Sequence, residues 1–155
     1  MVNKIVHCIV IALVLTSLAL SAADMRSGTW KLNTAKSKFS PGPGPKSNII
    51  TYSMEGDWVV GKAESVNAEG KATSGSNRYK LDGKEYPYKT PLVEGTISVK
   101  QIDDFNSEAT IKGGGKHRVT SKTVISKDGK TRTLTSPGVN AEGKPVNSVA
   151  VYEKQ

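Results

Sequence analysis

The chain has 155 residues, of which 36% are hydrophobic and 6% aromatic, and 22 Lys and Arg against 14 Asp and Glu give a net charge of +8. This length suffices for one domain and not for two. The lysines are scattered, without a cluster or interleaved aromatic residues, which argues against a nucleic-acid partner. A basic surface instead favours acidic partners, such as an anionic cell-envelope surface.

The first element in chain order is a predicted signal peptide at residues 1–23. Lys4 precedes the apolar run IVHCIVIALVLTSLAL, and small residues at Ser21 and Ala23 fit a cleavage site. The run is somewhat short for the ~20 residues that a bilayer span needs. We therefore expect cleavage between Ala23 and Asp24, export to the periplasm or the exterior of a bacterium, and one mature domain at residues 24–155.

Cleavage removes Cys8, the only cysteine, so the mature domain contains no disulfide. It also removes Lys4, the only charged residue of the leader, and so lowers the net charge to +7. The one remaining histidine, His117, cannot by itself form a zinc site or a Cys–His nucleophile pair. The sequence thus predicts no metal, no cofactor and no catalytic residue, and the protein is expected not to be an enzyme.

Strand-like runs rich in Val, Ile, Thr and Tyr extend from residue 28 to the end, and no segment has a helical period. Turns centred on glycine, which favour tight hairpins, separate these runs at Gly56, Gly70, Gly83, Gly113 to Gly115, Gly129 and Gly143. The predicted strands are 28–33, 47–55, 58–66, 71–81, 84–88, 95–102, 107–112, 117–126, 130–136 and 145–153.

An open sheet of so many strands would expose its edges, and closure removes them. We therefore predict an all-β fold, a single antiparallel up-and-down β-barrel of about 8–10 strands. Alternation directs Ile97, Val99 and Ile111 inward, whereas strands 117–126 and 130–136 are mostly Thr, Ser and Lys, so the interior should be narrow and partly polar. VNAEGK occurs at 66–71 and 139–144, which fits either a fold duplication or two hairpins with the same turn chemistry.

Between the first two strands, residues 34–46 contain Pro41, Pro43 and Pro45. Proline removes a backbone donor and clashes with the preceding helical turn. This segment should therefore be an extended, mobile crossover.

The opening Gly28-Thr29-Trp30 and the final strand, VYEKQ after a DGK hairpin, resemble the calycin superfamily, which comprises lipocalins, fatty-acid-binding proteins and avidins. The resemblance implies that Trp30 closes one end of the barrel against the last strand, with Gly28 permitting close backbone approach. GTWKL at 28–32 is similar to fatty-acid-binding proteins in particular. The chain most closely resembles small exported bacterial proteins of unassigned function that share GTWKLN, AKSKFSPGPGPK and NAEGKPVN, which implies no activity.

Three features depart from these families. Fatty-acid-binding proteins have a helix-turn-helix after the first strand, which the prolines exclude here. Tyr152 matches the tyrosine that holds the ligand carboxylate in those proteins, but Ala150 occupies the position of its arginine partner. Avidins use several tryptophans, and only Trp58 accompanies Trp30.

The candidate ligand-binding residues are Tyr79, Arg118, Arg132 and Tyr152. An inward arginine would offer a fork of donors to a carboxylate or phosphate, but alternation also allows Arg118 and Arg132 to face solvent. The leading hypothesis is an exported, monomeric, non-catalytic barrel that binds a lipid-like or aromatic ligand. The alternative is an envelope-associated structural or interaction protein with a filled barrel and a basic surface.

Overall fold

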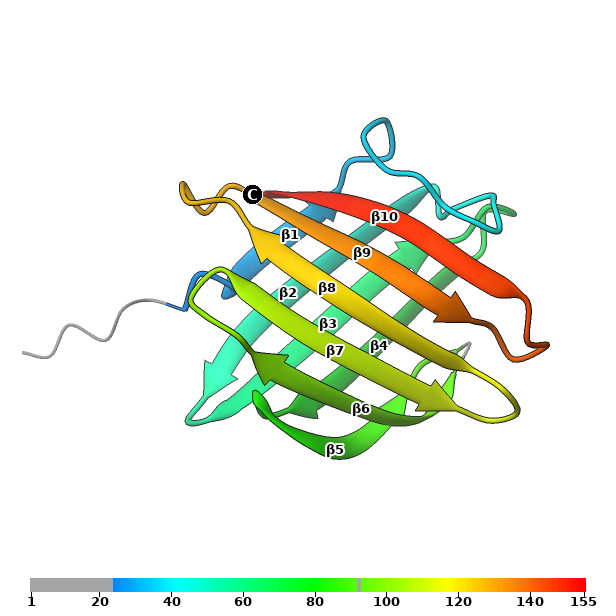
Figure 1. Ribbon diagram of the computed structural model, residues 1–155. Helices are drawn as coiled ribbons and strands as arrows, with labels where there is room; N and C mark the ends of the chain where they lie inside the picture. Colours follow the sequence, from blue (N-terminus) through cyan, green and yellow to red (C-terminus); the bar gives the residue numbers. More distant parts are fainter. Residues whose placement is uncertain (1–23, 92) are drawn as a thin grey trace, which may run out of the picture.

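The computed structural model describes residues 24–91 and 93–155, so the predicted signal peptide lies outside the described residues. Ten β-strands form the domain (Figure 1), which confirms the all-β prediction. They are β1 (Gly28–Leu32), β2 (Ser47–Glu55), β3 (Trp58–Val66), β4 (Ala72–Tyr79), β5 (Asp82–Lys89), β6 (Glu94–Gln101), β7 (Asn106–Gly113), β8 (Arg118–Ile125), β9 (Thr131–Val139) and β10 (Pro145–Lys154). Within these ranges no helix is long and apolar enough to cross a membrane.

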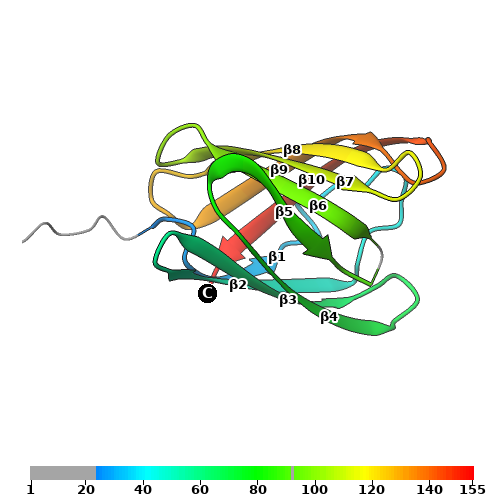
Figure 2. The same ribbon diagram turned by 90° about the horizontal axis from the view of Figure 1, so that it is seen from below.

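Except for β4 and β5, each strand pairs antiparallel with the next, and β10 returns to pair with β1, giving the order β4-β3-β2-β1-β10-β9-β8-β7-β6-β5. Figure 2 shows the two halves of this sheet facing each other, with β1 to β4 on one side and β6 to β9 on the other. In the described part of the chain, β4 and β5 share no hydrogen-bonded ladder. The fold is therefore a nearly closed up-and-down barrel with one seam.

The β1–β10 pairing closes the barrel around Trp30. Trp30 lies opposite Lys154, is 0% exposed, and packs with Leu32, Ile125 and Tyr152. Its indole Nε1 donates a hydrogen bond to the Arg26 carbonyl at 2.7 Å, which satisfies the one polar atom of a buried ring. The predicted plug is confirmed.

Gly28 is required at the start of β1 for two reasons. Its φ of +114° is a conformation that L side chains rarely adopt, and a Cβ there would lie 2.9 Å from the Lys154 side chain. The positive φ is the stronger of the two, because the Lys154 side chain could move aside, and the close backbone approach expected at Gly28 stays a prediction.

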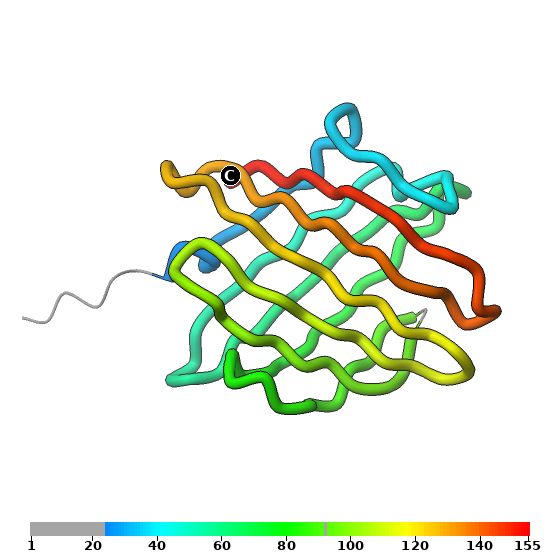
Figure 3. Tube along the Cα trace, viewed as in Figure 1, coloured from blue at the N-terminus to red at the C-terminus, as the bar shows by residue number. Residues whose placement is uncertain are grey.

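The crossover between β1 and β2 contains no helix, as the prolines predict. Figure 3 shows this segment at one end of the barrel, next to β10. Lys38 and Val149 exchange two backbone hydrogen bonds of 2.7 Å, and the Asn147 N–H donates to the Ser40 carbonyl at 2.9 Å. The first half of the crossover is thus tied to β10, and the mobility of the proline-rich half stays a prediction.

Two strand bounds differ from the prediction for backbone reasons. Gly83 was predicted to centre a turn, but it lies inside β5 with a φ of +78°, next to a register shift between Asp82 and Glu85. β9 was predicted to end before Pro137, yet it continues to Val139. Its pairing with β8 is interrupted around Pro137, so the missing N–H of this proline leaves no hydrogen bond of that ladder unmade.

Candidate functional site: a cavity around a buried arginine

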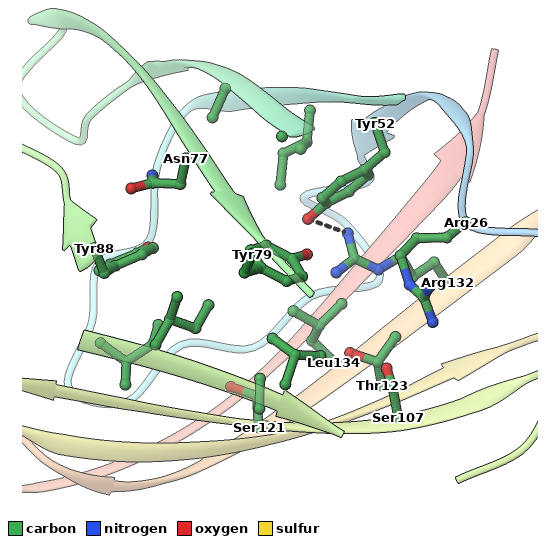
Figure 4. Close-up of a pocket in the computed structure, with 17 residues that line it drawn as sticks. Arg26, Tyr52, Asn77, Tyr79, Tyr88, Ser107, Ser121, Thr123, Arg132 and Leu134 are labelled. Atoms are coloured by element: carbon green, nitrogen blue, oxygen red, sulfur yellow. Dashed lines mark hydrogen bonds between the residues drawn. The ribbon is translucent and has the colours of Figure 1, made fainter. Parts of the chain in front are cut away.

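A cavity of about 200 Å³ lies inside the barrel (Figure 4). One wall is apolar and comes from β6, β7 and β9, with Ile97, Val99, Ala109, Ile111 and Leu134. The inward orientation of Ile97, Val99 and Ile111 confirms the predicted alternation. The remaining lining is rich in phenols, hydroxyls and guanidinium groups, as expected for a partly polar interior.

Arg132 on β9 is the central polar residue of this cavity. It is 6% exposed, and its Nη1 donates a hydrogen bond of 3.0 Å to the Tyr52 hydroxyl. The guanidinium carbon lies 4.8 Å from the centre of the Tyr52 ring and 5.8 Å from that of Tyr152. Its Nε has no hydrogen-bond partner among the described residues, and no carboxylate of the described ranges lies within ion-pair distance of it.

The phenols of Tyr152 and Tyr79 remain neutral at physiological pH, because the pKa of each is raised. Burial raises the pKa of Tyr152 to about 12, against the lowering effect of the nearby Arg132. Burial likewise raises the pKa of Tyr79, which both Arg132 and Arg26 lower in part. These tyrosines contribute ring faces and hydroxyls, but they do not neutralise the guanidinium.

A second buried arginine, Arg26, lines the same cavity and is 5% exposed. Its Nη1 forms an ion pair with Asp24 at 3.3 Å. Sequence analysis missed Arg26 because it precedes the first strand and so has no alternation pattern to place it. Tyr52, also missed, could have been found, because it alternates with Ile50 on one face of the predicted strand 47–55.

Three of the four candidate residues lie close to one another. Tyr79 is 8% exposed, Tyr152 is 7% exposed, and Arg132 contacts the Tyr152 ring across the β9–β10 pairing. Arg118 instead is exposed on the outer face of β8, because Ser121, Thr123 and Ile125 occupy the inward positions. The structure thus places Arg132 inside and Arg118 outside, while ligand binding by any of these residues stays a prediction.

An open hollow of about 360 Å³ adjoins the cavity at the end of the barrel opposite the Trp30 plug. Tyr152 and Asn48 line it, and the Tyr152 hydroxyl donates to Asn48 Oδ1 at 2.9 Å. Asn77 and Tyr88 line both spaces. Asn77 Oδ1 also accepts the Lys89 backbone N–H at 2.9 Å, which bridges the seam between β4 and β5. We refer to this hollow as the mouth.

The arrangement offers donors and ring faces rather than a metal centre. Within residues 24–91 and 93–155, no group of three or more His, Cys, Asp or Glu side chains gathers where it could hold an ion. What the site can do chemically is accept a compact anion at Arg132 and an apolar group against the β6–β7 wall.

The fold is similar to that of two solved lipid- and bile-acid-binding barrels. A Schistosoma mansoni fatty-acid-binding protein in complex with arachidonic acid matches with a TM-score of 0.59 and 16% identity, over 84% of this chain and 96% of that one. Zebrafish ileal bile-acid-binding protein complexed with cholic acid matches with a TM-score of 0.55 and 14% identity, over 84% and 99%. No family model and no curated protein matches the sequence.

Proposed function

We propose that this protein binds a small amphiphile with an anionic head inside its barrel and performs no chemistry on it. The observation that supports this most directly is the Arg132 guanidinium, buried in a cavity without a carboxylate partner in the described chain. Burying a charge costs several kcal/mol unless it is paired. Phenol contacts recover part of this cost, and a bound anion would recover the rest.

The arginine from β9 replaces the one that the sequence lacks on β10. Ala150 occupies the position of the carboxylate-binding arginine in the resembling family, and Arg132 lies directly opposite Tyr152 on the neighbouring strand. The Arg132 guanidinium faces the cavity and lies 5.8 Å from the ring centre of Tyr152, which lines the adjoining mouth, so a guanidinium and a phenol lie close together as in a carboxylate clamp, although they come from a different pair of positions. This arrangement supports a lipid-like or aromatic acid as the ligand.

Cavity size limits the ligand. About 200 Å³ corresponds to about seven water-sized groups, and typical ligand pockets of about 300–1,000 Å³ are larger. A short acid fits the cavity alone, whereas a longer tail must extend past Asn77 and Tyr88 into the mouth. Medium-chain acids should consequently bind better than hexadecanoate.

We also infer that the protein acts outside the cytoplasm as a monomer. The sequence of residues 1–23 supports export, and the chain without its leader contains no cysteine. Both structural neighbours are named as binding proteins, which supports a carrier rather than an enzyme.

Native mass spectrometry of protein purified from its own host tests the proposal without assuming a ligand. A co-purifying small acid is expected. Isothermal titration with octanoate then tests the site, with Arg132→Ala expected to reduce binding at least tenfold. Arg118→Ala is the matched control, since it removes an exposed arginine from the adjacent strand and should leave affinity unchanged. Equal octanoate affinity in both variants would exclude the proposed site.

The filled-barrel alternative also has an observation in its favour. The crossover and the turns after β3, β7 and β9 carry six lysines and two glutamates, namely Lys36, Lys38, Lys46, Lys71, Lys116, Lys144, Glu69 and Glu142, and of these lysines Lys36 pairs with Glu153. A basic end favours an anionic envelope surface. Binding to anionic vesicles by protein that takes up no octanoate would favour this role over ligand binding.

A further inference from the structure

Two arginines, far apart in the sequence, lie at the same end of the cavity. Arg26 and Arg132 are both less than one-tenth exposed, and no other charged side chain of the described residues lines this space. Figure 4 shows both guanidinium groups at the end of the cavity beside Tyr52. Both also act electrostatically on the Tyr79 hydroxyl. This end of the cavity therefore carries two cationic groups.

Most donors of these two guanidinium groups have no partner in the described chain. Arg132 uses Nη1 alone, toward Tyr52, and Arg26 uses Nη1 alone, toward Asp24. Each arginine has five N–H donors, so Nε and Nη2 of both residues remain available to a ligand.

Two hydroxyls extend this donor set. Ser107 on β7 and Thr123 on β8 pair in register, are each 7% exposed, and line the cavity next to the arginines (Figure 4). Neither side chain makes a hydrogen bond to another residue of ranges 24–91 and 93–155. Both hydroxyls line the cavity, so they can donate to the oxygens of a group bound beside the two guanidinium groups.

We propose, building on the proposed function, that the ligand head is a phosphate monoester held between Arg26 and Arg132, with Ser107 and Thr123 donating to its remaining oxygens. A carboxylate has two oxygens and cannot use all of these donors. A phosphate monoester has three terminal oxygens and a charge near −2 at pH 7. The alkyl tail then lies along Ile97, Val99 and Ile111 toward the mouth.

Asp24 acts in this scheme as an exchangeable counterion. It contacts the Arg26 guanidinium only through Nη1, at 3.3 and 3.5 Å, whereas charge-assisted hydrogen bonds are usually about 2.7–2.9 Å, and its Oδ1 also accepts the Arg26 backbone N–H at 2.9 Å. Its side chain is 22% exposed. Rotation of this carboxylate away from Nη1 breaks only the two long contacts and leaves both guanidinium groups to the phosphate.

Isothermal titration at pH 7.5 with octyl phosphate, octanoate and inorganic phosphate tests the head group. We expect octyl phosphate to bind at least tenfold more tightly than octanoate, which corresponds to one additional charge-assisted hydrogen bond. Inorganic phosphate should bind more weakly than octyl phosphate, because it lacks the tail. Equal or tighter binding of octanoate would overturn this inference and leave the proposed function intact, whereas binding of neither amphiphile would remove both.

Single substitutions test which residues cause the preference for octyl phosphate over octanoate. Arg26→Gln should lower the affinity for octyl phosphate more than that for octanoate, so that their ratio falls toward unity. Asp24→Asn should raise the affinity for octyl phosphate by removing the competing carboxylate. Arg118→Gln is the control and should change neither affinity. An unchanged ratio in a folded Arg26→Gln protein would overturn the proposal.

A pH series tests the same point without any substitution. The second ionisation of a phosphate monoester lies near pH 6, so affinity for octyl phosphate should rise several-fold from pH 5.5 to 7.5. Arg26, Asp24, Arg132, Tyr52, Tyr79, Tyr88 and Tyr152 are the titratable groups that face the site. The octanoate series corrects for any titration of Asp24. Parallel curves for the two ligands would contradict a requirement for the dianion.

Discussion

The β1–β10 closure and the β4–β5 seam join the same sheet by different means. At the closure, a ladder and the buried Trp30 hold the strands together, and the indole has a hydrogen-bond partner inside the fold. Along the seam, described residues form no ladder, and side chains make the contacts instead: Asn77 of β4 accepts the Lys89 backbone N–H of β5, and Trp58 of the next strand, β3, makes an edge-to-face contact with Tyr86 of β5. The closure is built for stability, and the seam is built from contacts that can separate.

The largest loss of stability is expected when the Trp30 plug is removed from the closure. Trp30→Ala deletes a fully buried ring and should lower the free energy of unfolding by about 3–5 kcal/mol. Urea denaturation followed by circular dichroism measures the loss. A loss below 1 kcal/mol would show that the closure does not depend on the plug.

High pH should weaken the closure next. The folded-state pKa of Tyr152 is raised to about 12, above the value near 10 of an unfolded chain. The unfolded state therefore releases its proton first, and the stabilisation that is complete below pH 10 is lost as the pH rises through 12, by about 3 kcal/mol at most. The free energy of unfolding of the Tyr152→Phe variant, measured by urea denaturation, should fall less steeply between pH 10 and 12 than that of the unsubstituted protein. Identical slopes for the two proteins would contradict the burial of this phenol.

Replacing Trp58, the tryptophan beside the seam, should lower the free energy of unfolding less than replacing Trp30. Trp58 is half-buried, with the Arg78 guanidinium 4.3 Å from its ring centre and the Tyr86 ring at 5.2 Å. Such contacts contribute about 0.5–1.5 kcal/mol each, so Trp58→Ala should cost about 1–2 kcal/mol. A loss equal to that of Trp30→Ala would erase the distinction between the two regions.

The smallest loss of stability is expected when the hydrogen bond from the Lys89 N–H to the Asn77 side chain is removed. Asn77→Ala removes the acceptor of the Lys89 N–H and should cost about 1 kcal/mol or less. Hydrogen exchange at the Lys89 amide should accelerate, with little change along β1 and β10. Asn147→Ala, an exposed asparagine of β10 whose side chain bonds to no described residue, is the control. Protection of Lys89 in the Asn77 variant would mean that another group holds the seam.

The closure was predictable from the sequence, and the seam was not. Trp30, the strand rhythm and the prolines of the crossover are local signals, and the structure confirms each of them. The seam arises because β5 contains Pro87 and a bulge beside Gly83, and the sequence pattern does not show which strand pair such features will separate.

The site was predictable only in part, for the same reason. Tyr79 and Tyr152 follow from alternation and from the family resemblance. Arg132 and Arg118 lie on strands with few large apolar residues, so the alternation that separates inside from outside is weak, although Leu134, two residues after Arg132, shares its inward face. Arg26 precedes every strand, and only the three-dimensional fold brings it to the cavity.

The central claim is that Arg132 serves a ligand rather than the fold, and Arg132→Met tests it directly. Removing an uncompensated buried charge while keeping the side-chain volume should leave the stability of the ligand-free protein unchanged or raise it, by up to about 2 kcal/mol. The same variant should lose octanoate and octyl phosphate binding, with Arg118→Met as the control. Calorimetric unfolding with and without ligand measures both quantities. An Arg132→Met protein that is less stable by more than 2 kcal/mol yet binds both ligands normally would contradict the account.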